Sequence, residues 1–173
     1  MALNFYKIEC GNETKYIKNI YCQLKPISRG IKSLTVFAEQ ILTINDYILS
    51  NFEILHKTSR NNFQKVLLNV STEYCSTIST LPPFMKVLMS LIEKSSINLS
   101  HECPYLPVKE IGVKNFIVNS NLLTLVAFLG IESGEFLVTM NIKDENGDFI
   151  FKFKVYFLLE KERYGKKSKL NKS

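Results

Sequence analysis

The sequence predicts a mostly β protein, an antiparallel β-sandwich with one main helix. Several segments alternate apolar and polar residues with a period of two, which is typical of half-buried strands. By contrast, a single segment, between about Leu81 and Ser95, has the apolar spacing of an amphipathic helix. Asn146-Gly147 separates two of the alternating segments. This pair favours a tight hairpin turn, because both residues tolerate positive φ angles.

The chain has 173 residues, of which 46% are hydrophobic and 22% charged, a composition typical of a globular protein with a single core. We expect one domain over residues 1–160 and a basic, disordered tail over 161–173. From Glu160 to Ser173, six basic residues stand against two acidic ones, so most of the net charge of +6 lies in the tail. With no aromatic-and-basic recognition motif, we expect no nucleic-acid partner.

Period-two alternation predicts four strands in the first half of the chain, over residues 4–10, 19–27, 44–57 and 63–72. The last two flank a turn-like TSRNN segment and should form an antiparallel hairpin. On the expected inner faces of that hairpin lie Ile48, Phe52 and Ile54 from one strand and Val66, Leu68 and Val70 from the other.

The helix should follow, with Ser79-Thr80 as its cap region and prolines in its first turn. Its apolar positions span an arc of about 200°, roughly twice the width that a helix on one sheet needs. Either the helix packs against the fold on two sides, or part of the apolar stripe faces a ligand.

A second hairpin is expected around Asn146-Gly147, from strands over 136–143 and 149–159. One apolar face should carry Phe136, Val138, Met140 and Ile142, and the other Phe149, Phe151, Phe153, Val155 and Phe157, with Lys152 and Lys154 directed away.

The four cysteines allow three disulfide connectivities, and none has the close spacing of a zinc or redox site. The strand map favours one connectivity. A turn after the first strand would bring Cys10 to Cys22, while Cys75 and Cys103 lie before and after the helix. We therefore expect the pairs Cys10–Cys22 and Cys75–Cys103.

Asn-x-Ser/Thr triplets occur at Asn12, Asn69 and Asn98, and we expect these asparagines to be glycosylated. Disulfides and glycans both need the secretory pathway. The first residues lack the regions of a signal peptide, and no apolar run approaches the roughly 20 residues of a membrane span. We expect an extracellular protein that does not span a membrane.

His101, Glu102 and Cys103 are consecutive, but no HExxH or other metal-ligand spacing is present. His101 and Cys103 also lack a third group to orient them as a nucleophilic pair. Fingerprints of hydrolases, nucleotide-binding loops and dinucleotide-binding folds are missing. We expect no catalytic residue, metal or cofactor, and we interpret this stretch as a disulfide end beside a glycan.

Three runs of the sequence, LLNVSTEYC, LPPFMKVLMSLIEKSSINLSHECPY and GEFLVTMNIKDENGDFIFKFKVYF, together resemble a large insect family of small secreted proteins of unknown function. The resemblance covers about residues 4–160. That family is distantly similar to ML-type lipid-recognition domains, which include the ganglioside activator protein. The resemblance implies an immunoglobulin-like sandwich that holds a lipid between two sheets, and some insect relatives are linked to contact chemosensation and pheromone response.

The resulting hypothesis is a secreted, non-enzymatic carrier or sensor of a lipid-like or other hydrophobic small molecule, which an extracellular receptor could recognise. The candidate pocket wall is Phe84, Leu88, Phe136, Val138, Met140, Phe151, Phe153 and Phe157. The same residues could simply fill a core. An extracellular interaction domain with a dry core is the alternative, and an extracellular hydrolase is a weaker third reading. An apolar void between the sheets would favour the carrier.

Overall fold

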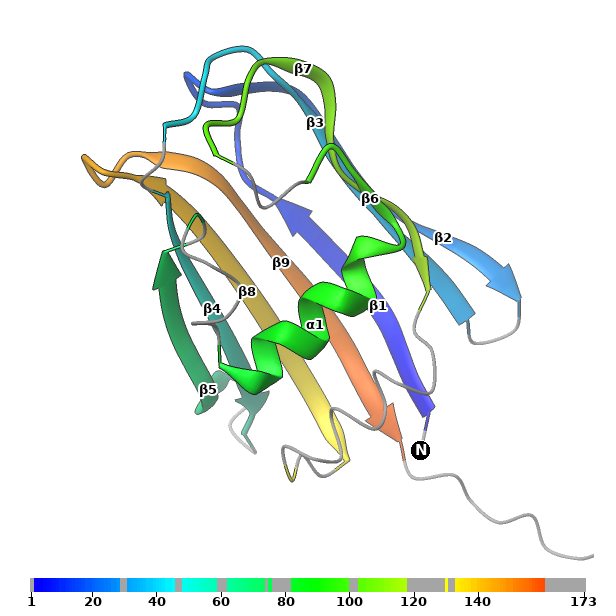
Figure 1. The fold of residues 1–173 in the computed structure, drawn as a ribbon. Helices are drawn as coiled ribbons and strands as arrows, with labels where there is room; N and C mark the ends of the chain where they lie inside the picture. Colours follow the sequence, from blue (N-terminus) through cyan, green and yellow to red (C-terminus); the bar gives the residue numbers. More distant parts are fainter. Residues whose placement is uncertain are drawn as a thin grey trace, which may run out of the picture.

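Two antiparallel β-sheets pack face to face in the computed structural model of the chain (Figure 1). The structure describes residues 2–28, 31–45, 48–58, 62–73, 75, 82–99, 103–117, 130 and 133–160. Within these residues it contains nine strands and one helix. The predicted β-sandwich with one main helix is therefore confirmed.

Five strands form one sheet and four form the other. The five-stranded sheet has the order β1 (Ala2–Cys10), β9 (Phe149–Glu160), β8 (Gly134–Asp144), β4 (Ile48–Lys57) and β5 (Phe63–Glu73). The four-stranded sheet has the order β2 (Ile17–Ser28), β3 (Ile31–Gln40), β7 (Val108–Ile117) and β6 (Ser96–Ile97).

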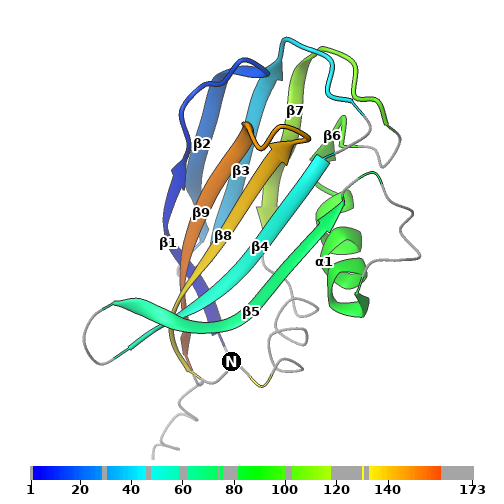
Figure 2. The ribbon, with the colours of Figure 1, turned by 90° about the vertical axis from the view of Figure 1, so that its left-hand side faces the viewer.

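Helix α1 (Pro83–Glu93) closes one side of the sandwich. It follows β5 and precedes β6, which are edge strands of the two sheets, and Figure 2 shows it lying beside both. The helix is two residues shorter at each end than predicted. Its N-cap is Pro82, without a side-chain hydrogen bond, while the expected cap at residues 79–80 lies outside the described residues.

The inner face of the five-stranded sheet is built from rows of side chains that cross the strands. One row is aromatic: Phe136 of β8 stacks on both His56 and Phe157, with ring centroids 4.8 and 5.2 Å apart, and Phe157 meets Phe5 edge-on. The next row is aliphatic and contains Ile54, Val138, Val155 and Ile8, which are paired in register. A third row contains Phe52, Met140 and Phe153.

Two bulges change the predicted faces of the hairpins. At the turn between β8 and β9, Ile142 pairs with Phe151 but Lys143 pairs with Phe149, so Ile150 is an extra residue. Ile150 is 3% exposed and Phe149 is 42% exposed, which reverses the prediction for Phe149. In β5 a bulge at Leu67 similarly leaves Val66 exposed, whereas Leu68 and Val70 pack against the core as predicted.

Both predicted disulfides are present, and they join the two sheets on opposite sides of the sandwich. Cys10–Cys22 links the edge strands β1 and β2. Cys75–Cys103 links the segment after β5 to the segment between β6 and β7, and both sulfurs pack beside the buried side chains of Ile44, Ile48, Tyr105 and Ile150.

Candidate ligand cavity

A cavity of about 270 Å³ lies between the two sheets. Among the described residues, every side chain in its wall is apolar except that of the tyrosine Tyr105. Along β9 the wall runs from Ile150 to Phe157, which is roughly 23 Å at the usual rise of a strand. The cavity is therefore elongated along the strands.

The five-stranded sheet supplies most of the predicted wall residues. Val138, Met140, Phe151, Phe153 and Phe157 line the cavity, and Leu88 lines it from α1. Phe136 is not among the described wall residues: it is 1% exposed and packs on the ring of Phe157. The side chain of Phe84 lies outside the part of the chain that the structure describes.

Burial along β8 shows the effect of the cavity on the normal alternation of a strand. Val138 and Met140 point inward yet are only partly buried, whereas Leu137 and Thr139 on the other face are buried. Inward-facing side chains in a filled sandwich are usually the most buried ones. Their residual exposure indicates that they border empty space rather than the opposite sheet.

The four-stranded sheet also lines the cavity, and some of its wall residues are small. Val36 and Ala38 of β3 and Gly112 and Val113 of β7 all line the cavity. Gly112 has a φ of 149°, and a Cβ atom there would lie 2.2 Å from the carbonyl oxygen of Val36. A side chain at this position is thus excluded, which keeps the wall thin where β7 approaches β3.

The wide apolar arc of helix α1 borders both the cavity and the protein core. Leu88, Met89 and Ile92 line the cavity, and Leu91 packs against the core beside Leu88 and Ile92. Val87 remains 42% exposed. Part of the stripe therefore packs on protein and part borders the cavity.

Residues around Ile44 and Tyr105 form one end of the cavity. These two residues make a short antiparallel bridge, with both backbone hydrogen bonds at 2.9 Å, and both line the cavity. Beside them Gln40 is 2% exposed and donates from Nε2 to the carbonyl oxygens of Leu42 and Tyr105. Its buried Oε1 accepts no hydrogen bond from the described residues.

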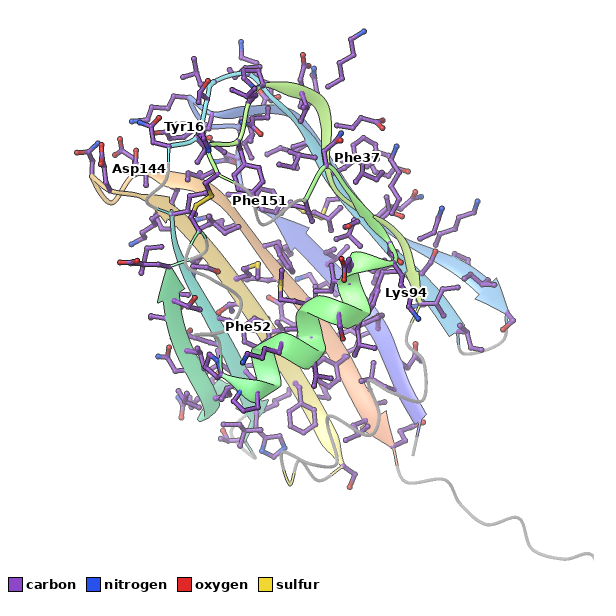
Figure 3. All side chains as sticks on the ribbon, in the orientation of Figure 1. Tyr16, Phe37, Phe52, Lys94, Asp144 and Phe151 are labelled. Atoms are coloured by element: carbon purple, nitrogen blue, oxygen red, sulfur yellow. A yellow bond between two sulfur atoms is a disulfide. The ribbon has the colours of Figure 1, made fainter. Side chains whose placement is uncertain are left out.

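The charged groups nearest this end belong to the β8–β9 turn (Figure 3). The Tyr16 hydroxyl donates to Asp144 at 2.6 Å, and Asp144 also accepts from the backbone N–H groups of Asn146 and Asp148. These hydrogen bonds, led by that from Tyr16, lower the pKa of Asp144 against the opposing effect of desolvation. The same bond raises the pKa of Tyr16. Lys15 forms ion pairs with Asp144 and Asp148.

The chemistry available in the wall is that of contact with an apolar molecule. No Asp, Glu, Lys, Arg or His side chain is among the wall residues in the described part of the chain. Over the same residues, no group of three His, Cys, Asp or Glu side chains is placed to hold a metal ion. No helix there is long and apolar enough to cross a membrane.

The expected glycan acceptors Asn12, Asn69 and Asn98 are all exposed. Asn12 lies between β1 and β2. The Asn69 side chain bonds Glu53 and Asn51, and the Asn98 side chain donates to the Glu110 carbonyl oxygen at 2.7 Å. Glycosylation itself stays a prediction, and residues 101–102 and the tail after 160 lie outside the described residues.

The wall contributed by β3 and β7 was not predicted from the sequence. Alternating Leu34, Val36 and Ala38 gave a signal, but the apolar Phe37 on the other face of β3 obscured it.

Residues 45–138, more than half of the chain, match the model of a family described as "Protein of unknown function (DUF1091)". A search of curated proteins finds no match.

Proposed function

We propose that this chain, which belongs to the DUF1091 family of proteins of unknown function, is a non-enzymatic binding protein for an apolar small molecule held between its two sheets. The observation that carries the proposal is the elongated apolar cavity of about 270 Å³. Its size is close to the lower end of the range for small-molecule pockets, roughly 300–1,000 Å³. Its length suits a chain-like molecule better than a compact one.

The apolar wall also supports this function energetically. A ligand that lay in the cavity would bury apolar surface of the wall, which is favourable by about 25 cal/mol per Å². Such a ligand would need no charged group, because the described wall residues offer none.

Two further parts of the proposal rest on the sequence. The disulfides and the exposed Asn-x-Ser/Thr triplets fit an extracellular protein. The resemblance to ML-type domains, which hold a lipid between two sheets, suggests a lipid-like ligand such as a long-chain hydrocarbon, ester or fatty alcohol. A carrier or sensor in chemosensation is the role that this resemblance favours.

The test is thermal unfolding of the protein with a panel of long-chain hydrocarbons, esters and fatty alcohols. A ligand that binds only the native state stabilises it by about 2.7 kcal/mol at 100 times its Kd. For a chain of this size that corresponds to a rise in Tm of roughly 5–10 °C. No rise with any member of the panel would favour the interaction domain with a dry core.

A matched pair of phenylalanines makes the test specific to the cavity. Phe153 lines the cavity, and Phe136 points inward from the neighbouring strand but packs outside the wall. Phe136→Ala should destabilise the ligand-free protein by about 3–5 kcal/mol and leave the ligand-induced rise in Tm intact. Phe153→Ala should destabilise it less but reduce that rise.

A filling substitution gives the converse result. Ala38→Leu adds apolar volume to the wall, and in a true void it should keep or raise the ligand-free Tm, by up to about 2 kcal/mol in stability. It should also abolish the ligand-induced rise. A large loss of stability in Ala38→Leu would show that the space is already filled, contrary to the proposal.

A further inference from the structure

Three isoleucines are exposed together at one end of the four-stranded sheet. Ile27, Ile31 and Ile117 have 52%, 47% and 42% of their surface exposed. Ser28 pairs with Ile31, and Ile117 pairs with Ser33, so the three lie at the adjoining ends of β2, β3 and β7 within about two residues of one another. We call these residues the isoleucine tip.

Lysines outnumber carboxylates in the strand segments that form the isoleucine tip. Lys25 pairs with Ser33 and Lys32 pairs with Pro26, so both lysines flank the tip on neighbouring strands. Lys114 lies three residues before Ile117 and sits over the Phe37 ring, with its charge partly balanced by Glu110. Within residues 24–28, 31–35 and 113–117 there is no Asp or Glu.

Strand β9 also ends at this end of the sandwich. Ala2 pairs with Glu160, so β9 ends where β1 begins. Strand β2 is tied to β1 by Cys10–Cys22, but the two strands diverge, and β2 ends at the same end of the sandwich to one side of that point (Figure 1). Thirteen more residues follow Glu160, and six of them are lysine or arginine.

The opposite end of the sandwich provides a contrast. Leu42 and Leu106 are 47% and 65% exposed there. Next to Leu42, the Ile41 backbone N–H donates to the Tyr16 carbonyl oxygen, and the Tyr16 hydroxyl bonds Asp144. Lys15 at this end is in ion pairs with two carboxylates. Exposed apolar residues thus occur at both ends, but Lys15 is held by carboxylates, whereas residues 24–28, 31–35 and 113–117 carry lysines and no Asp or Glu.

We propose that the isoleucine tip docks on the surface of an anionic lipid bilayer. The isoleucines enter the boundary between head groups and acyl chains, and Lys25 and Lys32 contact the lipid phosphates. Apolar burial and attraction to anionic lipids add in interfacial binding of this kind. The inference uses the outer surface alone, so it stands or fails separately from ligand binding in the cavity.

The test is co-sedimentation of the full chain with vesicles of phosphatidylcholine alone and with one quarter phosphatidylglycerol. Wild type should bind the anionic vesicles more tightly at about 10 mM salt than at about 150 mM, because the Debye length falls from about 30 to about 8 Å. Lys25→Gln with Lys32→Gln should weaken binding roughly 25-fold, since each lysine near such a surface contributes about fivefold.

The apolar contribution is tested with a control at the other end. Ile27→Ser with Ile31→Ser should weaken vesicle binding about tenfold or more, because each half-exposed isoleucine loses a favourable apolar transfer. Leu42→Ser with Leu106→Ser removes a similar exposed area and should leave binding unchanged. Circular dichroism and Tm establish that all variants are folded.

Three results would overturn the proposal. One is the absence of wild-type binding to anionic vesicles at low salt. Another is equal loss of binding in the isoleucine and leucine variants. The third is self-association of the wild type that the isoleucine variant abolishes while vesicle binding persists, which would assign the tip to a second copy of the chain. None of these results depends on the ligand-induced change in Tm.

Discussion

Asp144 shows how one buried carboxylate fixes a turn that the sequence predicts. Asn146-Gly147 indicates a hairpin there, and Gly147 takes a positive φ of 82°. The Asp144 side chain, 7% exposed, accepts backbone hydrogen bonds from Asn146 and Asp148 and holds the turn closed. Tyr16 comes from 128 residues away in sequence, so this anchor could not be predicted from local patterns.

Asp144→Asn should destabilise the fold by about 2 kcal/mol at neutral pH, because hydrogen bonds to a charged group are stronger than neutral ones. Asp148→Asn is the matched control: Asp148 shares the partner Lys15 but is 58% exposed, so its loss should change stability little. Urea denaturation measures both. Equal effects of the two substitutions would contradict the buried anchor.

The same carboxylate predicts a pH dependence. Because the pKa of Asp144 is lowered in the folded state, its stabilising contribution is present above the unfolded pKa of about 3.9. The contribution is lost as the pH falls through the folded value. The stability difference between wild type and Asp144→Asn should therefore shrink below about pH 4. A difference that stays constant from pH 7 to pH 3 would be inconsistent with this linkage.

Two glycines with positive φ should respond very differently to substitution. Gly147 has nothing within 4 Å of an added Cβ, so Gly147→Ala should cost about 1 kcal/mol of conformational strain. At Gly112 the added Cβ would also lie 2.2 Å from the Val36 carbonyl oxygen. Gly112→Ala should cost about 3 kcal/mol or more, again by urea denaturation. Similar costs at both positions would show that β3 and β7 separate easily.

At the scale of elements, alternation predicted those strands that keep one regular face. Strand β4 buries Ile48, Phe52 and Ile54 as expected. Strand β7 escaped prediction because it carries an extra residue twice, between Phe116 and Val113 and between Ile111 and Val108, opposite regular two-residue steps of β3. A bulge transfers the following side chains to the other face, and a fixed period of two fails there. Phe149 and Val66 were misassigned for the same reason.

The two disulfides should differ modestly in their contributions to stability. The loops they close span 12 and 28 residues. The chain-entropy model gives about 3 kcal/mol for the first and about 3.5 kcal/mol for the second. Replacing each pair with serines and measuring urea unfolding tests this. A much larger loss for Cys75→Ser with Cys103→Ser would mean that the bond also supports the Ile44–Tyr105 end directly.

At the scale of the whole molecule, the sequence could predict which side chains point inward but not how far apart the sheets lie. Phe153 and Phe136 have the same residue type and the same inward direction, yet only Phe153 borders the cavity. Ala38 and Gly112 line the cavity from the other sheet, in strands that were not predicted. The sequence therefore predicted only the part of the cavity wall that the five-stranded sheet and the helix contribute.

The covalent links on both sides of the sandwich have a kinetic consequence. One disulfide ties β1 to β2, and the other ties the segment after β5 to the segment before β7. Neither side of the sandwich can therefore open by separation of the two sheets. A molecule in the cavity must leave past the strand ends or by a displacement of α1, whose Leu88, Met89 and Ile92 form part of the wall. Residence times should then follow local opening of the helix, and reduction of the disulfides should shorten them.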